Sequence, residues 1–191
     1  MGRLKDRYCI VGVGETEYSR NSGRTTRAMA VEAIKKAMDN AGLGPKDVDG
    51  MMSYQSNDST PSLIVGPDLG IRLNFWMDVV GGGSSTEALI GLAMGAIEVG
   101  MCRTVALFRS MNGYTEVRIG GTGTRAAAPV RGQELATRPY GMTSAGQTFA
   151  PTFMRHMYDY GTTSEQVAHV KVAQSKHATQ NPKAFYKERV T

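Results

Sequence analysis

Residues 78–100, which read DVVGGGSSTEALIGLAMGAIEVG, constrain the fold of this chain more than any other stretch. The apolar run that ends here, residues 75–80, has the composition of a buried β-strand. Three glycines follow it, and they allow the backbone to turn sharply and to approach a ligand closely. An apolar helix with small residues at helical spacing comes next. The pattern therefore predicts a strand, a tight turn and a helix in direct succession.

The predicted turn is the first candidate site. The amino end of a helix presents free N–H groups and the positive end of the helix dipole, which suit an oxyanion, a phosphate or a reactive carbonyl. Ser84 or Ser85 is predicted to cap the helix, and Glu87 is placed to complete a capping box with Ser84. The alternative is a tight turn that has no chemistry. The candidate oxyanion or substrate turn consists of Gly81, Gly82, Gly83, Ser84 and Ser85.

The rest of the chain alternates between strand and helix patterns. Short β-rich runs predict strands at residues 8–13, 51–54 and 104–108, and Gly12 and Gly14 are predicted to close the first strand into a turn. Amphipathic spacing and capping residues predict a first helix from Thr25 or Thr26 to Ala41, with Gly42 as its C′ residue, and further helices at residues 62–69 and 147–160. A last helix is predicted from a cap at Thr163 or Ser164 to a break at Asn181-Pro182. This alternation predicts an α/β layered fold with a partly parallel sheet.

Residues 109–146 have a different composition. Glycine, threonine and arginine dominate, and no helical period is present. A connection of this length inside a compact domain is commonly a binding loop or a flap. Its arginines are candidates to meet a phosphate or an acidic substrate, and the alternative is a solvated surface.

Composition limits the function class. The formal net charge of +5 fits an anionic ligand such as the phosphates of coenzyme A, or simply solubility. The sequence has no basic run interleaved with aromatic residues, which is the pattern that indicates nucleic-acid binding. The two cysteines lie in unlike contexts, which favours a reducing compartment over disulfides or a metal site. The sequence has no signal region or membrane-length apolar segment, so we predict a cytoplasmic protein without a membrane span.

The glycine turn and its helix resemble the nucleophile turn of the thiolase superfamily, in which a catalytic cysteine lies between a strand and a small-residue helix. RHMYDYGTTSEQVAHV (155–170) and KHATQNPKA (176–184) resemble phrases of sterol-carrier-type thiolases. The resemblance implies a thiolase-like fold, layered α/β/α, with the first βαβαβ half and an inserted loop domain. The implied domains are residues 1–108 for the α/β part and residues 109–191 for the loop domain with its helices.

The family's nucleophile falls at or within one residue of Gly82, and neither Cys9 nor Cys102 is near that position. Ordinary thiolase chemistry needs a thiolate to carry the acyl group. Without a cysteine at this position, the sequence resembles a cysteine-less branch of the family, the lipid-transfer-protein thiolases similar to sterol-carrier-protein-x thiolase. This branch includes side-chain aldolases. That branch implies retro-aldol cleavage of a β-hydroxyacyl-CoA such as a sterol side chain. Two alternatives stay open: an acetyl-CoA acetyltransferase or β-ketoacyl-CoA thiolase, and a non-catalytic acyl-CoA or lipid-binding subunit.

The resemblance covers the whole chain but only the first of the two similar halves of a thiolase subunit. We therefore expect an N-terminal fragment, a split subunit or a truncated form, inactive alone, whose acid/base residues lie outside this chain. The resemblance also implies a CoA ester as substrate, no covalently bound cofactor, a homodimer and a small zinc-ribbon/OB-fold partner protein. Because the loop domain of thiolases closes over the CoA ester, Arg109, Arg118, Arg125 and Arg131 are CoA-binding candidates. Lys176 is a further candidate because it lies on a basic side of the last predicted helix, for which the alternative is a solvated face.

Overall fold

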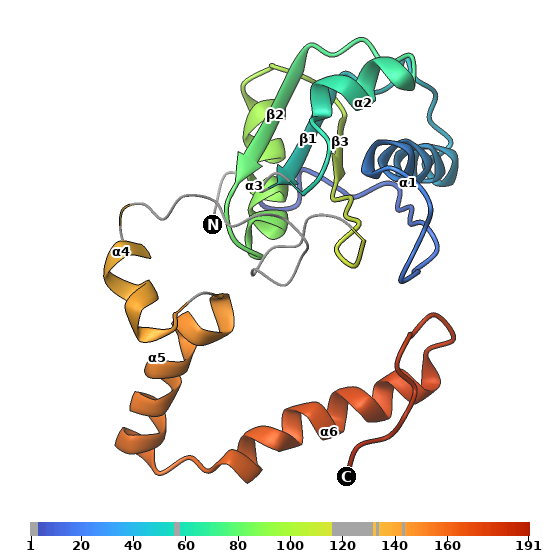
Figure 1. The fold of residues 1–191 in the computed structure, drawn as a ribbon. Helices are drawn as coiled ribbons and strands as arrows, with labels where there is room; N and C mark the ends of the chain where they lie inside the picture. Colours follow the sequence, from blue (N-terminus) through green and yellow to red (C-terminus); the bar gives the residue numbers. More distant parts are fainter. Residues whose placement is uncertain (1–3, 56–57, 116–131, 133, 143) are drawn as a thin grey trace. The chain divides into compact units, whose positions relative to one another are not determined.

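The structure is a computed structural model that describes residues 4–55, 58–115, 132, 134–142 and 144–191 (Figure 1). The described residues fall into two compact units, residues 4–115 and residues 132–191. The domain boundary predicted between residues 108 and 109 stays a prediction. None of the helices in the described residues is long and apolar enough to cross a membrane.

The first unit alternates helices and strands, as the sequence predicts. Its strands form a parallel three-stranded sheet in the order β2–β1–β3, so the central strand is the first in sequence. This confirms the predicted α/β architecture with a parallel sheet. The elements are α1 (Thr26–Ala41), β1 (Gly50–Gln55), α2 (Ser62–Asp68), β2 (Phe75–Val80), α3 (Ser85–Glu98) and β3 (Val105–Phe108).

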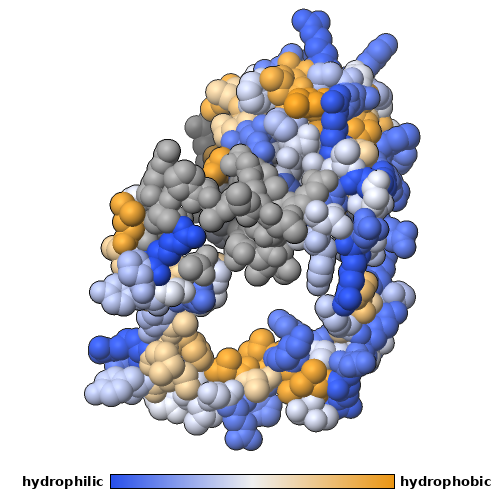
Figure 2. Space-filling model, viewed as in Figure 1, coloured by the Kyte–Doolittle hydropathy of each residue, from blue (hydrophilic) through white to orange (hydrophobic). Residues whose placement is uncertain are grey.

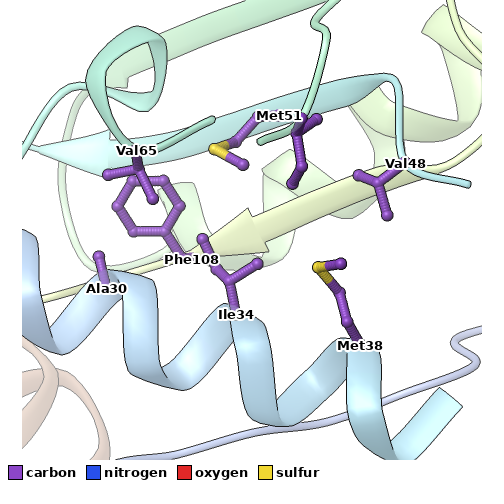
Figure 3. Packing of buried hydrophobic residues seen from close by; sticks show 8 residues of the cluster. Ala30, Ile34, Met38, Val48, Met51, Val65 and Phe108 are labelled. Carbon is purple, nitrogen blue, oxygen red and sulfur yellow. The ribbon is translucent and has the colours of Figure 1, made fainter. Parts of the chain in front are cut away.

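Helices cover both faces of this sheet. On one face Met51 of β1 and Phe108 of β3 pack with Ile34 of α1 and Val65 of α2 (Figure 3). On the other face a smaller cluster joins α3 to β1, and it consists of Met52, Tyr54, Leu89 and Ala93. The side chains of alternate residues of β1 thus point to opposite faces of the sheet, as the two-residue period of a strand requires. The first unit therefore has the predicted α/β/α layers.

Helix α1 has the predicted ends. The Thr25 hydroxyl accepts a hydrogen bond from Ala28 N at 3.1 Å, and Gly42 ends the helix with φ of 68°. A left-handed residue at this position favours glycine, because a Cβ would be strained there. The buried side of the helix carries four apolar residues, Met29, Ala30, Ile34 and Met38.

The strand predicted at residues 8–13 is wrong. The segment is extended, but among the described residues it joins no strand ladder. Gly12 and Gly14 do not form the predicted turn. Instead they lie directly on α1, where an added Cβ would come within 2.2 Å of the carbonyl oxygens of Ala37 and Ala33. Close backbone contact with a helix replaces strand pairing.

Asp49 joins the starts of the strands at the amino edge of the sheet. Its Oδ1 accepts from Arg103 N at 2.7 Å and from Thr104 N at 3.0 Å, just before β3. Its Oδ2 accepts from Asn74 Nδ2 at 3.1 Å, just before β2. Partial burial acts to raise the pKa of this carboxyl, but these three hydrogen bonds outweigh burial and hold the pKa below its usual value. One carboxylate therefore fixes this edge.

The second unit contains α4 (Glu134–Thr137), the 3₁₀ turn η1 (Arg138–Tyr140), α5 (Ala145–Tyr160) and α6 (Ser164–Gln180). The two short elements correct the expectation that residues 109–146 hold no helix. Helix α6 begins as predicted, because Thr163 and Gln166 form a capping box. Figure 2 shows apolar residues interspersed with polar ones on the surface of these helices. On α5 the exposed apolar residues include Phe149, Met154 and Tyr158.

Candidate functional site

The candidate turn lies where the strands of the first unit end. Because β1, β2 and β3 run parallel, their carboxyl ends share one edge of the sheet. Ligands of α/β proteins commonly bind outside this edge. The glycine turn follows β2 directly and leads into α3, as predicted. The glycine turn and the described residues that follow β1 and β3 therefore lie at the edge where a ligand is expected.

The glycine turn is open at its centre. An added Cβ at Gly81 would come within 2.3 Å of Ser85 Oγ, whereas no atom of the described residues lies within 4 Å of a Cβ added at Gly82 or Gly83. The turn is closed by a hydrogen bond of 3.0 Å from Ser85 N to Gly82 O. Its glycines and Ser84 are exposed. A ligand group therefore has direct access to the backbone at the position that the family resemblance gives to a nucleophile.

Ser84 stands at the N-cap position of α3 but does not act as predicted. Its side chain makes no capping hydrogen bond, so the predicted capping box with Glu87 is wrong. The physical reason is the backbone: Ser84 has φ of −69° and ψ of −6°, which is helical, whereas a side-chain cap requires an extended residue. The Ser84 side chain therefore accepts no hydrogen bond from the first turn of α3, where Ser85 N donates instead to Gly82 O.

Asp78 links the end of β2 to its neighbours. Its Oδ1 accepts hydrogen bonds from the buried Ser53 hydroxyl, on the paired residue of β1, and from Ser62 N at 3.0 Å. Its Oδ2 also accepts from Ser62 N, at 3.2 Å. The carboxylate thus fixes the start of α2 against the sheet, three residues before the glycine turn. Our sequence reasoning missed Asp78, although an aspartate inside the apolar strand FWMDVV indicates a partly buried charge with hydrogen-bond partners.

Arg109 follows β3 and forms a second polar connection. Its Nη1 donates to Tyr54 O at 2.8 Å, and its Nη2 donates to the Asp58 carboxylate. The guanidinium also lies 4.3 Å from the centre of the Tyr54 ring, within reach of a cation–π contact. The side chains of Arg109 and Asp58 are 15% and 0% exposed. The structure thus joins Arg109 to protein groups; its predicted contact with coenzyme A stays a prediction.

The other predicted CoA contacts are Arg118, Arg125, Arg131 and Lys176. Arg118, Arg125 and Arg131 lie outside the described residues. Lys176 is exposed on α6, in the second unit, and its role also stays a prediction. The part of the chain that the structure describes has no group of three His, Cys, Asp or Glu side chains arranged to hold a metal ion.

Neither cysteine lies at the turn. Cys102 is buried just before β3, and burial, assisted by the nearby Asp49 carboxylate, raises the pKa of its thiol. A thiol with a raised pKa is a poor source of thiolate. Cys9 is exposed in the extended segment before α1.

Comparison with known proteins gives close matches along almost the whole chain, although no family model matches it. The chain is 34% identical over 194 residues to a protein named steroid side-chain-cleaving aldolase from Thermomonospora curvata, covering 99% of this chain and 49% of that protein. It is 33% identical over 187 residues to the 17-hydroxy-3-oxo-4-pregnene-20-carboxyl-CoA lyase of Mycobacterium tuberculosis, covering 96% and 48%.

A solved structure also matches almost the whole chain. The Ltp2-ChsH2(DUF35) aldolase matches with a TM-score of 0.81 at 34% identity, covering 95% of this chain and 46% of that chain. The chain spans about half the length of the curated relatives it matches.

Proposed function

Because this chain is a thiolase-like protein of the lipid-transfer, aldolase-like kind, we propose that it forms part of an enzyme that cleaves a carbon–carbon bond in a coenzyme A ester. The reaction is retro-aldol cleavage of a β-hydroxyacyl-CoA, with a steroid side chain as the substrate class. The observation that carries the proposal is the 34% identity, over 99% of this chain, to a steroid side-chain-cleaving aldolase. The name of the M. tuberculosis relative, a carboxyl-CoA lyase, supports the same chemistry.

Retro-aldol cleavage suits a site without a nucleophile. A base removes the proton of the β-hydroxyl, the bond between the α and β carbons breaks, and its electrons pass to the thioester as an enolate. A proton then returns to the α carbon, which gives a carbonyl compound and a shorter acyl-CoA. The steps need a base and stabilisation of the enolate oxygen, but no thiolate. Glycine at position 82, where the resemblance predicts the thiolase cysteine, is consistent with this requirement.

The glycine turn is the proposed place for the developing oxyanion. Residues 81–84 are exposed, no atom of the described residues lies within 4 Å of a Cβ added at Gly82 or Gly83, and the Ser84 side chain makes no capping hydrogen bond at the amino end of α3. Backbone N–H groups at the start of a helix stabilise negative charge. The acid and base groups are proposed to come from outside this chain.

The proposed assembly follows from the same family. We propose that this chain occurs in a thiolase-like homodimer, associated with a small zinc-ribbon/OB-fold protein, in the cytoplasm. The matched aldolase structure is named for two components, Ltp2 and ChsH2. CoA phosphates are proposed to meet basic residues from the set predicted above.

The test is a product assay on the complete polypeptide that carries this sequence, purified with any partner subunit. A β-hydroxyacyl-CoA should give a carbonyl product and a shortened acyl-CoA, and thiol alkylation should not reduce the rate. Thiolysis of a β-ketoacyl-CoA without any retro-aldol cleavage would refute the proposal in favour of a thiolase. Tight binding of the CoA ester without turnover would instead indicate a binding subunit.

A further inference from the structure

Residues 58–62, with the sequence DSTPS, form an unusually buried polar segment that leads from the loop after β1 into the first residue of α2. Asp58, Thr60 and Ser62 are 4%, 5% and 0% exposed. Loops with this composition ordinarily run over the surface, because their backbone groups need water. This loop must therefore be held in place by specific partners at the carboxyl edge of the sheet.

Two charged side chains hold the loop, one at each end. At its start, the Asp58 carboxylate accepts from Arg109 Nη2, and Arg109 also donates to Tyr54 O at the end of β1. At its end, Ser62 N donates to Asp78 of β2 at 3.0 Å. The loop is thus connected to all three strands, and its Asp78 attachment lies three residues before the glycine turn.

We propose that Arg109 is a positioning residue: through Asp58 it fixes residues 58–62 as a wall of the ligand site beside the glycine turn, and it does not contact a phosphate of coenzyme A. The inference rests on the proposed CoA-ester function of this edge. It also replaces, for this residue, the predicted role of Arg109 as a CoA contact.

The inference rests on the ion pair between Arg109 and the buried Asp58. Asp58 has a fully buried side chain, and removing the partner of a buried charge is strongly unfavourable. If Arg109 turned toward a phosphate, the Asp58 carboxylate would lose this counter-charge and Tyr54 O would lose its donor. The guanidinium fork satisfies both acceptors at once, which the single ammonium of lysine does not reproduce.

The experiment uses the complete polypeptide with its partner and compares Arg109→Lys, Arg109→Gln, Asp58→Asn and the double variant Asp58→Asn/Arg109→Gln. The matched control is Arg155→Gln on α5, since Arg155 also pairs with an aspartate, Asp159, and lies over a tyrosine, but is 74% exposed. Three quantities are measured: kcat/KM for cleavage, the Kd of free coenzyme A, and amide hydrogen exchange in residues 58–62.

We expect each single variant, including Arg109→Lys, to lower kcat/KM by about tenfold to a hundredfold, the scale of a small displacement in an active site. The double variant should be no worse than the more damaging single variant, because both changes break one connection. The Kd of coenzyme A should change by less than about twofold, and exchange in residues 58–62 should rise in every variant except the control.

A phosphate contact would give the opposite pattern. Arg109→Gln would weaken coenzyme A binding about tenfold or more, Arg109→Lys would retain much of the affinity, and Asp58→Asn would leave it unchanged or improve it. That result overturns the inference, as does unchanged exchange in residues 58–62. If Arg109→Gln does not fold, Arg109→Lys and Asp58→Asn decide the question. If the wild type neither binds coenzyme A nor cleaves an ester, both the proposed function and the ligand-site role of residues 58–62 are overturned. Hydrogen exchange in the variants then still tests whether Arg109 holds residues 58–62 in place.

Discussion

Replacing Asp49 by alanine tests how the amino edge of the sheet is held. The variant loses the hydrogen bonds that Asp49 accepts from Arg103 N, Thr104 N and Asn74 Nδ2. A hydrogen bond to a charged group contributes about 1.5–3 kcal/mol, and the partial exposure of this carboxylate reduces the sum. We therefore expect Asp49→Ala to lower the free energy of unfolding at neutral pH by about 2–4 kcal/mol.

The difference in free energy of unfolding between wild type and Asp49→Ala should depend on pH. The pKa of Asp49 is lower in the folded protein than in the unfolded chain, so its stabilising contribution is fully present above the unfolded pKa of about 3.9. The contribution is lost as the pH falls through the folded pKa. The free-energy difference between wild type and Asp49→Ala should be constant down to about pH 5 and should shrink below about pH 3.9.

The assay is urea unfolding followed by circular dichroism across this pH range, with m-values compared at each pH. Asp49→Asn retains an oxygen that accepts from both backbone donors and should lose about half as much stability. Asp39→Ala is the control, because Asp39 is an exposed carboxylate that pairs only with Lys35 among its described contacts. A loss at neutral pH below about 0.5 kcal/mol, or a difference that grows in acid, would refute the reasoning.

Three further predictions concern other elements. Gly12→Ala should lower the free energy of unfolding by about 1–3 kcal/mol, because its Cβ would meet a backbone oxygen of α1. Gly91→Ala on α3 should be neutral or stabilising, because no atom of the described residues lies within 4 Å of the added Cβ. Equal melting temperatures for the two variants would contradict this. An aromatic disulfide reagent should react rapidly with Cys9 but with Cys102 only on unfolding, because Cys102 is buried and burial raises the pKa of its thiol. Rapid reaction of both thiols in the folded protein would contradict the fold. Thr163→Ala should destabilise α6 by about 1 kcal/mol and speed its proteolysis, whereas Thr163→Ser should behave as wild type.

The helices and strands with strong local signals could be predicted from the sequence. The β2–turn–α3 succession and the end of α1 at Gly42 depend on residues within a few positions of each other. Residues 8–13 could not be assigned correctly in this way. Their β-branched composition is the same in a paired strand and in an extended segment, and only a distant partner, here α1, decides between them.

The candidate site was predictable only in outline. The position of the glycine turn follows from the sequence, but whether Ser84 caps α3 depends on its ψ angle, which the motif does not fix. The partners of Arg109 and Asp78 come from elements far away in sequence, so spacing could not identify them. A single charged residue within an apolar strand, as at Asp78, was the available clue.

The order of the strands has a consequence for how the first unit forms. Gly50 of β1 pairs with Phe75 and with Val105, so joining β3 closes a loop about twice as long as joining β2. Doubling a loop adds about 0.6 kcal/mol of closure entropy. We therefore expect β1, α2 and β2 to assemble first and β3 to dock afterwards, with the Arg109–Asp58 pair closing at that late step. Pulse-labelled hydrogen exchange should show β1 and β2 protected before β3, and simultaneous protection would contradict this order.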